Sequence, residues 1–76
     1  MELTIEIRRN GDWHVAHCLE LDIASQGETE DEARQMIVEA VTLYLETASP
    51  AEIQERLEEY RRSCADTPFR AERLKV

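Results

Sequence analysis

The sequence predicts an α+β fold: an antiparallel sheet of three to four strands, one main helix packed on it and a second short helix, in the order β-β-β-α-α-β. Three observations predict it. Apolar and polar residues alternate near the amino terminus, as in half-buried strands. An Asn-Gly pair then marks a tight turn. Two later segments begin with capping residues and continue at helical spacing, so we expect one domain over residues 1–76.

The first two strands are predicted to form a hairpin. Leu3, Ile5 and Ile7 alternate with polar residues, and the run WHVAHC at residues 13–18 is rich in strand formers. Between them, Asn10-Gly11 supplies the positive-φ residues of a two-residue turn.

The sequence allows two registers for the pairing of these strands. If Arg9 pairs with Asp12, then Trp13 and Val15 lie on the face away from the isoleucines. If the loop has three residues and a bulge, both side chains join the isoleucines in the core. We favour the first register, because small Ala16 then faces a helix that can pack closely.

A third strand is predicted at residues 23–27, and the first helix follows it. Thr29 and Glu32 form a capping box, in which each side chain binds the other residue's backbone N–H. Glu30 and Asp31 complete a first turn in which the helix dipole favours anions. The predicted buried stripe of this helix consists of Ala33, Ile37, Ala40, Val41, Tyr44 and Leu45.

The second helix is predicted to start at Ser49-Pro50, with serine as the cap and proline at the first helical position. One face carries Ile53, Leu57, Tyr60 and Cys64, and the predicted i,i+4 ion pairs are Glu52–Arg56 and Glu58–Arg62. The tail FRAERLKV is too short for a further helix and is the candidate fourth strand.

Negative charge is concentrated in the first two-thirds of the chain. The net charge is −8, and residues 1–48 hold eleven acids and three bases, whereas the remainder is balanced. Such a field repels phosphate backbones, so we expect no direct binding of nucleic acid. It favours a basic partner protein. The alternative interpretation is that the charge only keeps a small domain in solution.

The sequence predicts neither an enzyme nor a cofactor or metal site. In HVAHC, His14 and Cys18 share a strand face about 13 Å apart at ~3.3 Å per residue, while His17 points to the other face. Cys18 and Cys64 are expected to be free thiols. No apolar run reaches the ~20 residues that a membrane span needs, and no secretion signal is present, so we expect a cytoplasmic location.

Acids that flank the third strand, together with the Trp13 strand, are the candidate partner-binding residues: Trp13, Val15, Glu20, Asp22, Glu28, Glu30 and Asp31. We also expect a homodimer, because a small core gains stability when the edges of its sheet or the Trp13 face are covered.

Four motifs of the first two-thirds of the chain are distinctive together: the aromatic second strand that ends in Cys18, the turn Leu19-Glu20-Leu21, the Ser-x-Gly-x-Thr junction at residues 25–29 and the Tyr-Leu-Glu at residues 44–46. In these motifs, residues 13–46 resemble the amino-terminal domain of the HicB family of antitoxins. The likeness covers residues 3–46 well and the rest weakly. The resemblance implies a partial ribonuclease H-like arrangement without catalytic residues. It also implies a partner, the small basic ribonuclease toxin HicA.

Two departures bear on what the resemblance implies. Leu19 stands where the family usually has proline, so the shape of the turn after the second strand is open. No basic helix of an appended DNA-binding domain follows, so operator binding is not implied. An orphan dimeric interaction module without a toxin is the alternative function, and a minimal hydrolase is the third and weakest.

Overall fold

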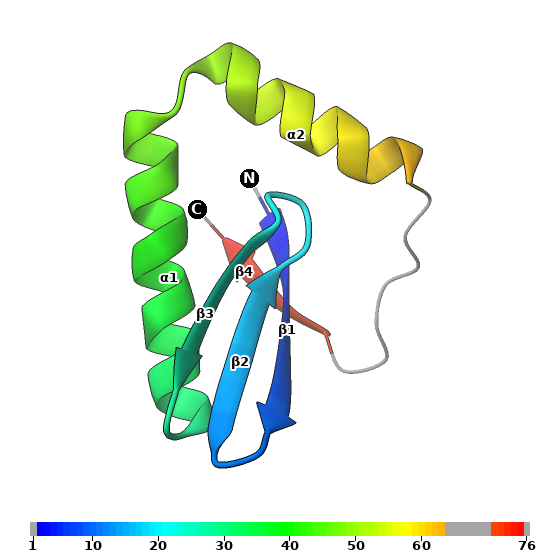
Figure 1. The fold of residues 1–76 in the computed structure, drawn as a ribbon. Coiled ribbons are helices and arrows are strands. Elements are labelled where there is room, and N and C mark those ends of the chain that lie inside the picture. The colour runs from blue at the N-terminus through cyan, green and yellow to red at the C-terminus, as the bar shows by residue number, and fades with distance from the viewer. Residues whose placement is uncertain (1, 64–70, 76) are drawn as a thin grey trace.

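The computed structural model describes residues 2–63 and 71–75, and it confirms the predicted α+β class and element order (Figure 1). The elements are β1 (Glu2–Asn10), β2 (Trp13–Cys18), β3 (Ile23–Gly27), α1 (Glu30–Thr47), α2 (Pro50–Arg62) and β4 (Ala71–Lys75). The four strands form one antiparallel sheet in the order β3-β2-β1-β4, so the candidate fourth strand is confirmed. The predicted place of Cys64 on the second helix lies outside the described residues.

The β1–β2 hairpin turns one residue later than predicted. Asn10 pairs with Trp13, so the loop is Gly11-Asp12 and the predicted pairing of Arg9 with Asp12 is wrong. Gly11 has a φ of 65°, whereas Asn10 and Asp12 are not among the described residues with positive φ. Glycine at the first central position, with positive φ there alone, is the requirement of a type II′ turn.

The loop still has two residues, so the two faces of the hairpin remain as the favoured register predicts. Ile5 faces Cys18 and Ile7 faces Ala16 on the side that α1 covers. Trp13 and Val15 lie on the opposite side, and Trp13 is 44% exposed. The alternative that placed Trp13 in the core is therefore wrong.

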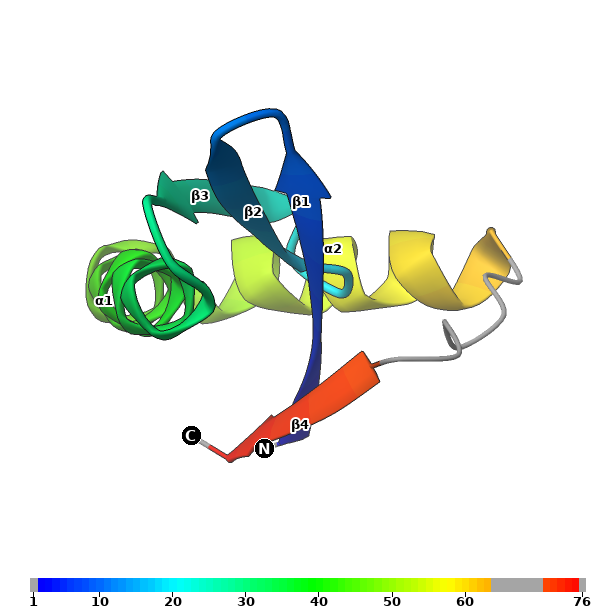
Figure 2. The ribbon, with the colours of Figure 1, turned by 90° about the horizontal axis from the view of Figure 1, so that it is seen from below.

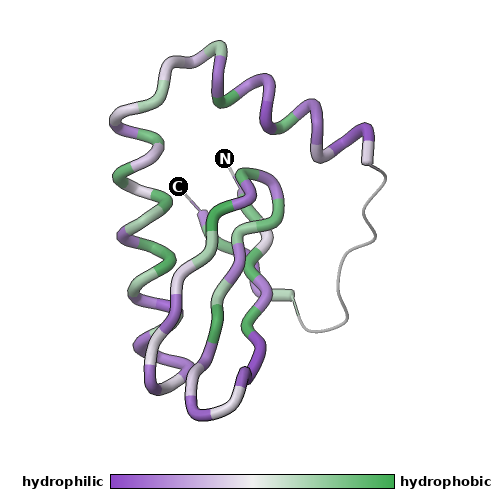
Figure 3. Tube along the Cα trace, viewed as in Figure 1, coloured by the Kyte–Doolittle hydropathy of each residue, from purple (hydrophilic) through white to green (hydrophobic). Residues whose placement is uncertain are grey.

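The sheet is strongly twisted and curves around α1 (Figure 2). Eight apolar residues from two strands, the β2–β3 turn and α1 form the buried core: Leu3, Ile5, Ala16, Cys18, Leu21, Ala33, Ile37 and Val41. The predicted helix stripe is confirmed for Ala33, Ile37 and Val41, which are buried, and Tyr44 and Leu45 pack against the core. Ala40 is only half-buried. Apolar residues of α1 gather on its strand-facing side (Figure 3). Close packing is possible because small residues, Ala16 and Ala33, meet between helix and sheet.

Both predicted helix caps form. The Thr29 hydroxyl accepts a hydrogen bond from the Glu32 backbone N–H at 3.0 Å, and the Ser49 hydroxyl accepts one from Glu52 at 3.2 Å. The return bond of the capping box, from the Thr29 N–H to the Glu32 carboxylate, is absent from the described residues. The Glu32 side chain therefore stays free for other contacts.

Helix α2 is held differently from α1. None of its residues is fully buried, and Leu57 is the residue that packs against the core. Arg56 does not form the predicted pair with Glu52. It donates instead to the Leu21 carbonyl at 2.6 Å and lies 5.1 Å from the Tyr44 ring centre. The other predicted pair, Glu58 with Arg62, is present at 3.7 Å.

Arg34 ties α1 to the edge strand β4. It donates to both carboxylate oxygens of Glu72, at 2.8 and 2.7 Å, and to Asp31 at 2.7 Å. The guanidinium holds the pKa of Glu72 below its usual value, and the same hydrogen bonds raise the pKa of Arg34. Within the described residues 2–63 and 71–75, neither helix has the length and apolar content of a transmembrane span.

Candidate partner-binding surface

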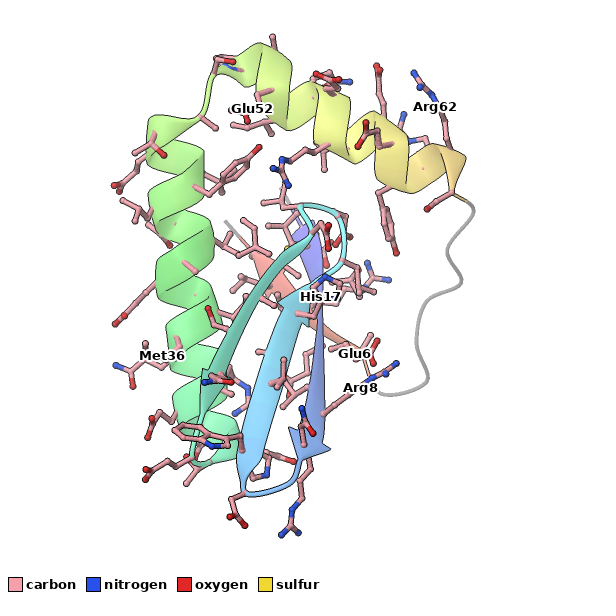
Figure 4. The ribbon with its side chains drawn as sticks, in the orientation of Figure 1. Glu6, Arg8, His17, Met36, Glu52 and Arg62 are labelled. Carbon is pink, nitrogen blue, oxygen red and sulfur yellow. The ribbon has the colours of Figure 1, made fainter. Side chains whose placement is uncertain are left out.

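The outer face of the sheet carries the first two candidate residues. Trp13 and Val15 project from β2 away from α1, because residues on one strand alternate between faces. A shallow hollow of about 500 Å³ lies on this face, lined by Glu6, Arg8, Val15, His17, Leu19 and Ala24. Glu6 and Arg8 form an ion pair at its edge, so the hollow mixes apolar surface with balanced charge (Figure 4).

The β2–β3 turn holds the next two candidates, Glu20 and Asp22, of which only Asp22 is free to contact a partner. Both carboxylate oxygens of Glu20 are used within the fold: they accept from the Thr4 backbone N–H at 2.7 Å and from the Thr4 hydroxyl at 2.8 Å. Asp22 is exposed and lies 2.9 Å from the His17 ring. It adopts a φ of 54°, which is uncommon for a residue other than glycine, although Asp tolerates it better than most.

The β3–α1 junction holds the last three candidates. Glu28, Glu30 and Asp31 are all exposed, at the end of the sheet opposite the β2–β3 turn (Figure 1). Asp31 pairs with Arg34 at 2.7 Å. Glu28 and Glu30 form no ion pair with any described residue.

The seven candidates therefore do not form one cluster. The β2–β3 register pairs His14 with Gly27, which puts Trp13 and Glu28 one step beyond the last pair, so the tryptophan borders the acidic junction. Glu20 and Asp22 lie at the other end of the sheet. There, Asp22 joins acids of α2 around a second hollow, lined by Asp22, Glu52, Glu55, Arg56 and Glu59.

Two features of this surface were missed from the sequence. The α2 acids beside Asp22 come from a segment whose net charge is zero, so charge counting along the chain could not find them. The outward side of α1 was also missed, where Met36 is 43% and Leu43 is 61% exposed. Their seven-residue spacing, off the buried stripe, was the available signal, and Figure 4 shows Met36 pointing away from the sheet.

The two histidines and the cysteine of β2 are divided between the two faces of the strand. His14 and Cys18 lie on the inner face of β2 and His17 on the outer face, as the strand period predicts. Cys18 is a free, buried thiol, and burial raises its pKa to about 11, so it stays protonated near neutral pH. No group of three metal-ligating side chains occurs in the part of the chain that the structure describes.

Comparisons with family models, with curated proteins and with solved structures find no match for this chain. The fold and the surface chemistry therefore carry the functional argument together with the resemblance of residues 3–46.

Proposed function

We propose that this chain is a HicB-like antitoxin that binds and neutralises a HicA-like ribonuclease, an mRNA interferase toxin, in a type II toxin–antitoxin system. The observation that carries the proposal is an excess of exposed carboxylates without a side-chain partner among the described residues. Glu28, Glu30, Glu32, Glu39 and Glu46 form no ion pair or side-chain hydrogen bond with the described residues. Charges of this kind steer a basic partner and speed its association.

The proposal assigns no catalysis, no cofactor and no contact with nucleic acid or membrane to this chain, and it places the protein in the cytoplasm. The toxin supplies the ribonuclease active site, and this chain, on a partial ribonuclease H-like scaffold, neutralises the toxin by binding it. Because the acids repel phosphate, the same field that attracts a basic toxin keeps RNA away from the complex.

The test is reconstitution with the product of an adjacent gene that encodes a short basic protein with a lone histidine. The two proteins are co-expressed, and the complex is isolated through a tag on the toxin. We expect co-purification, RNA cleavage by the toxin alone, and loss of cleavage when this chain is added in equal amount. This chain alone should leave RNA intact with and without Mg²⁺ or Mn²⁺.

A toxin that binds this chain no better than it binds an unrelated acidic protein of similar charge would refute the proposal. RNA cleavage by this chain that disappears on mutating one Asp or Glu would replace it with the hydrolase function.

The outer face of the sheet, which no described helix covers, favours a second candidate, an orphan homodimeric interaction module. The hollow at Val15 has balanced charge, and exposed Trp13 lies on the same face, so two copies can meet there without like-charge repulsion. Sedimentation of the wild type and of Trp13→Ser tests it. A wild-type dimer that dissociates in the variant supports this interface, and a wild-type monomer at millimolar concentration rejects it.

A further inference from the structure

We infer that the outward side of α1 is a docking surface for a basic amphipathic helix of a partner protein. The inference deepens the proposed function and rests on it for the biological partner, whereas the test below uses a synthetic helix. The surface, termed here the α1 outer stripe, consists of Glu32, Met36, Glu39, Leu43 and Glu46.

The spacing of the stripe puts its five side chains on one side of the helix. Successive members are four, three, four and three residues apart, and residues at those separations are neighbours on a helix surface. The three glutamates therefore form one row at seven-residue spacing, and Met36 and Leu43 form a second row beside it. A coiled-coil seam has apolar residues at both positions of a repeat of about 3.5 residues, so this stripe offers half of such a seam, with glutamates at the other position.

The apolar row has no role in the core. Helix α1 contributes Ala33, Ile37 and Val41 to the buried cluster, while Met36 and Leu43 remain 43% and 61% exposed. Two large apolar side chains aligned on an otherwise charged helix are a surface that a partner can bury.

The acidic row forms no ion pair with the described residues. Glu32 does not return a hydrogen bond to the Thr29 cap, and neither Glu39 nor Glu46 pairs with a described cation. Glu46 lies in the last turn of α1, which has no basic residue, so its charge faces the negative end of the helix dipole. A carboxylate at that position destabilises the helix, so we infer that it interacts with a partner.

Charge decides what occupies the stripe. A second copy packed through the same stripe brings two rows of glutamates together, and the single basic residue of α1, Arg34, is already engaged by Asp31 and Glu72. Nucleic acid and anionic lipid carry the same sign as the stripe. A helix with leucine-like residues every seventh position, flanked by Lys or Arg, matches both rows, since its apolar residues cover Met36 and Leu43 and its cations meet the glutamates.

The probe is a synthetic helix of about 21 residues, long enough to be helical when bound, with leucine every seventh residue and lysines three and four positions from each leucine. A matched peptide carries glutamate in place of lysine. Binding is measured by fluorescence anisotropy at about 0.1 M and about 1 M salt, where the Debye length falls from about 10 Å to about 3 Å. Amide chemical shifts then map the contact.

We expect the lysine peptide to bind the wild type, with shifts confined to α1, and the glutamate peptide not to bind. Glu39→Lys with Glu46→Lys should weaken binding by about tenfold or more at low salt, and Leu43→Ser several-fold at both salt concentrations. The matched control, Glu2→Lys with Asp12→Lys on the β1–β2 hairpin, changes two exposed acids by the same charge and should alter binding less than about twofold. The α1 double variant should melt no lower than the wild type, because a cation in place of Glu46 suits the last turn of the helix.

Absence of peptide binding to the wild type overturns the inference, and so does an equal loss in the α1 double variant and in the hairpin control. The two proposals fail separately. If the toxin binds the wild type and the α1 variants with equal affinity, the docking inference is wrong and the antitoxin function stands. If the peptide binds α1 and no toxin binds, the antitoxin function is wrong and the docking surface stands.

Discussion

The two helices of this protein are attached to the rest of the fold in different ways. Helix α1 buries three residues completely and shares one core with β1, β2 and the β2–β3 turn. Helix α2 buries none, and its described anchors are the packing of Leu57 and the contacts of Arg56. In Figure 1, α2 crosses the end of the sheet, whereas α1 runs along it.

The difference in burial between the two helices indicates which part of this small chain contributes most to its stability. A domain of this size buries only about 60% of the surface that its unfolded chain exposes, so it can complete one core and little more. We expect the sheet and α1 to unfold as one cooperative unit, and α2 to open at lower free energy.

The largest expected effect comes from emptying the core beneath α1. Ile37→Ala should lower the free energy of unfolding by about 2–5 kcal/mol, because the lost methyl and methylene groups leave a cavity that the packed sheet cannot close. The same truncation on α2, Leu57→Ala, should cost clearly less, since its side chain is only half-buried. Urea denaturation of both variants measures the difference, and equal losses would show that α2 belongs to the same core.

The two glycines offer the next comparison. At Gly27, a Cβ would lie 2.6 Å from the Ala33 backbone nitrogen and 2.9 Å from the Glu32 carbonyl carbon, so Gly27→Ala forces α1 away from β3. We expect a loss of about 1–3 kcal/mol, typical of overpacking.

At Gly11, nothing lies within 4 Å of an added Cβ, and the only obstacle is its φ of 65°. Gly11→Ala should therefore cost about 1–2 kcal/mol through the left-handed backbone alone. Thermal melts measure the loss of stability in each variant, and amide chemical shifts locate the structural change: Gly27→Ala should shift the amides of α1, and Gly11→Ala only those of the hairpin. Equal shifts of the α1 amides in both variants would contradict this account of the junction.

The smallest stability effect is expected at the contact between α1 and β4. The pKa of Glu72 is held below its usual value by Arg34, so the pair stabilises the fold above the pKa of the unfolded glutamate, and this contribution is lost as pH falls through the lower, folded value. Arg34→Met should remove it. Both side chains are more than a third exposed, so the effect should stay below about 1 kcal/mol.

The measurement is the unfolding free energy at pH 7 and at pH 3, for the wild type and for Arg34→Met. The loss caused by the mutation should be larger at pH 7. Arg62→Met serves as the control, because its pair with Glu58 is long and exposed. A loss in Arg34→Met that does not change with pH would reject the ion pair as the cause.

Most of the fold could be predicted from the sequence, because local signals agree with the tertiary structure. The caps at Thr29 and Ser49 and the apolar stripe of α1 are set by neighbours in the chain. The hairpin loop was placed one residue early, because Asn10-Gly11 and Gly11-Asp12 both suit a two-residue turn. Their difference lies in which position takes positive φ.

The surface was less predictable, because its properties depend on contacts between distant residues. The hydrogen bond from Thr4 to Glu20 joins residues sixteen positions apart, and the one from Arg56 to Leu21 joins residues thirty-five positions apart. Contacts over such separations produce no local sequence pattern. The α1 outer stripe was visible as spacing, but whether Met36 is core or surface depends on where the sheet lies against the helix.

The central claim is that the acids from the β3–α1 junction onward serve a basic partner beyond capping a helix. The most direct test is the association rate constant with the HicA-like toxin at low and high ionic strength, for the wild type and for Glu28→Lys with Glu30→Lys, after the fold of the variant is verified. As helix-end charges, these two residues should cost no more than about 1–2 kcal/mol of stability when reversed. We predict slower association and a flatter dependence on salt in the variant, because exposed charges act through long-range steering. Equal rates and equal salt slopes would contradict the claim and leave these acids a purely structural role.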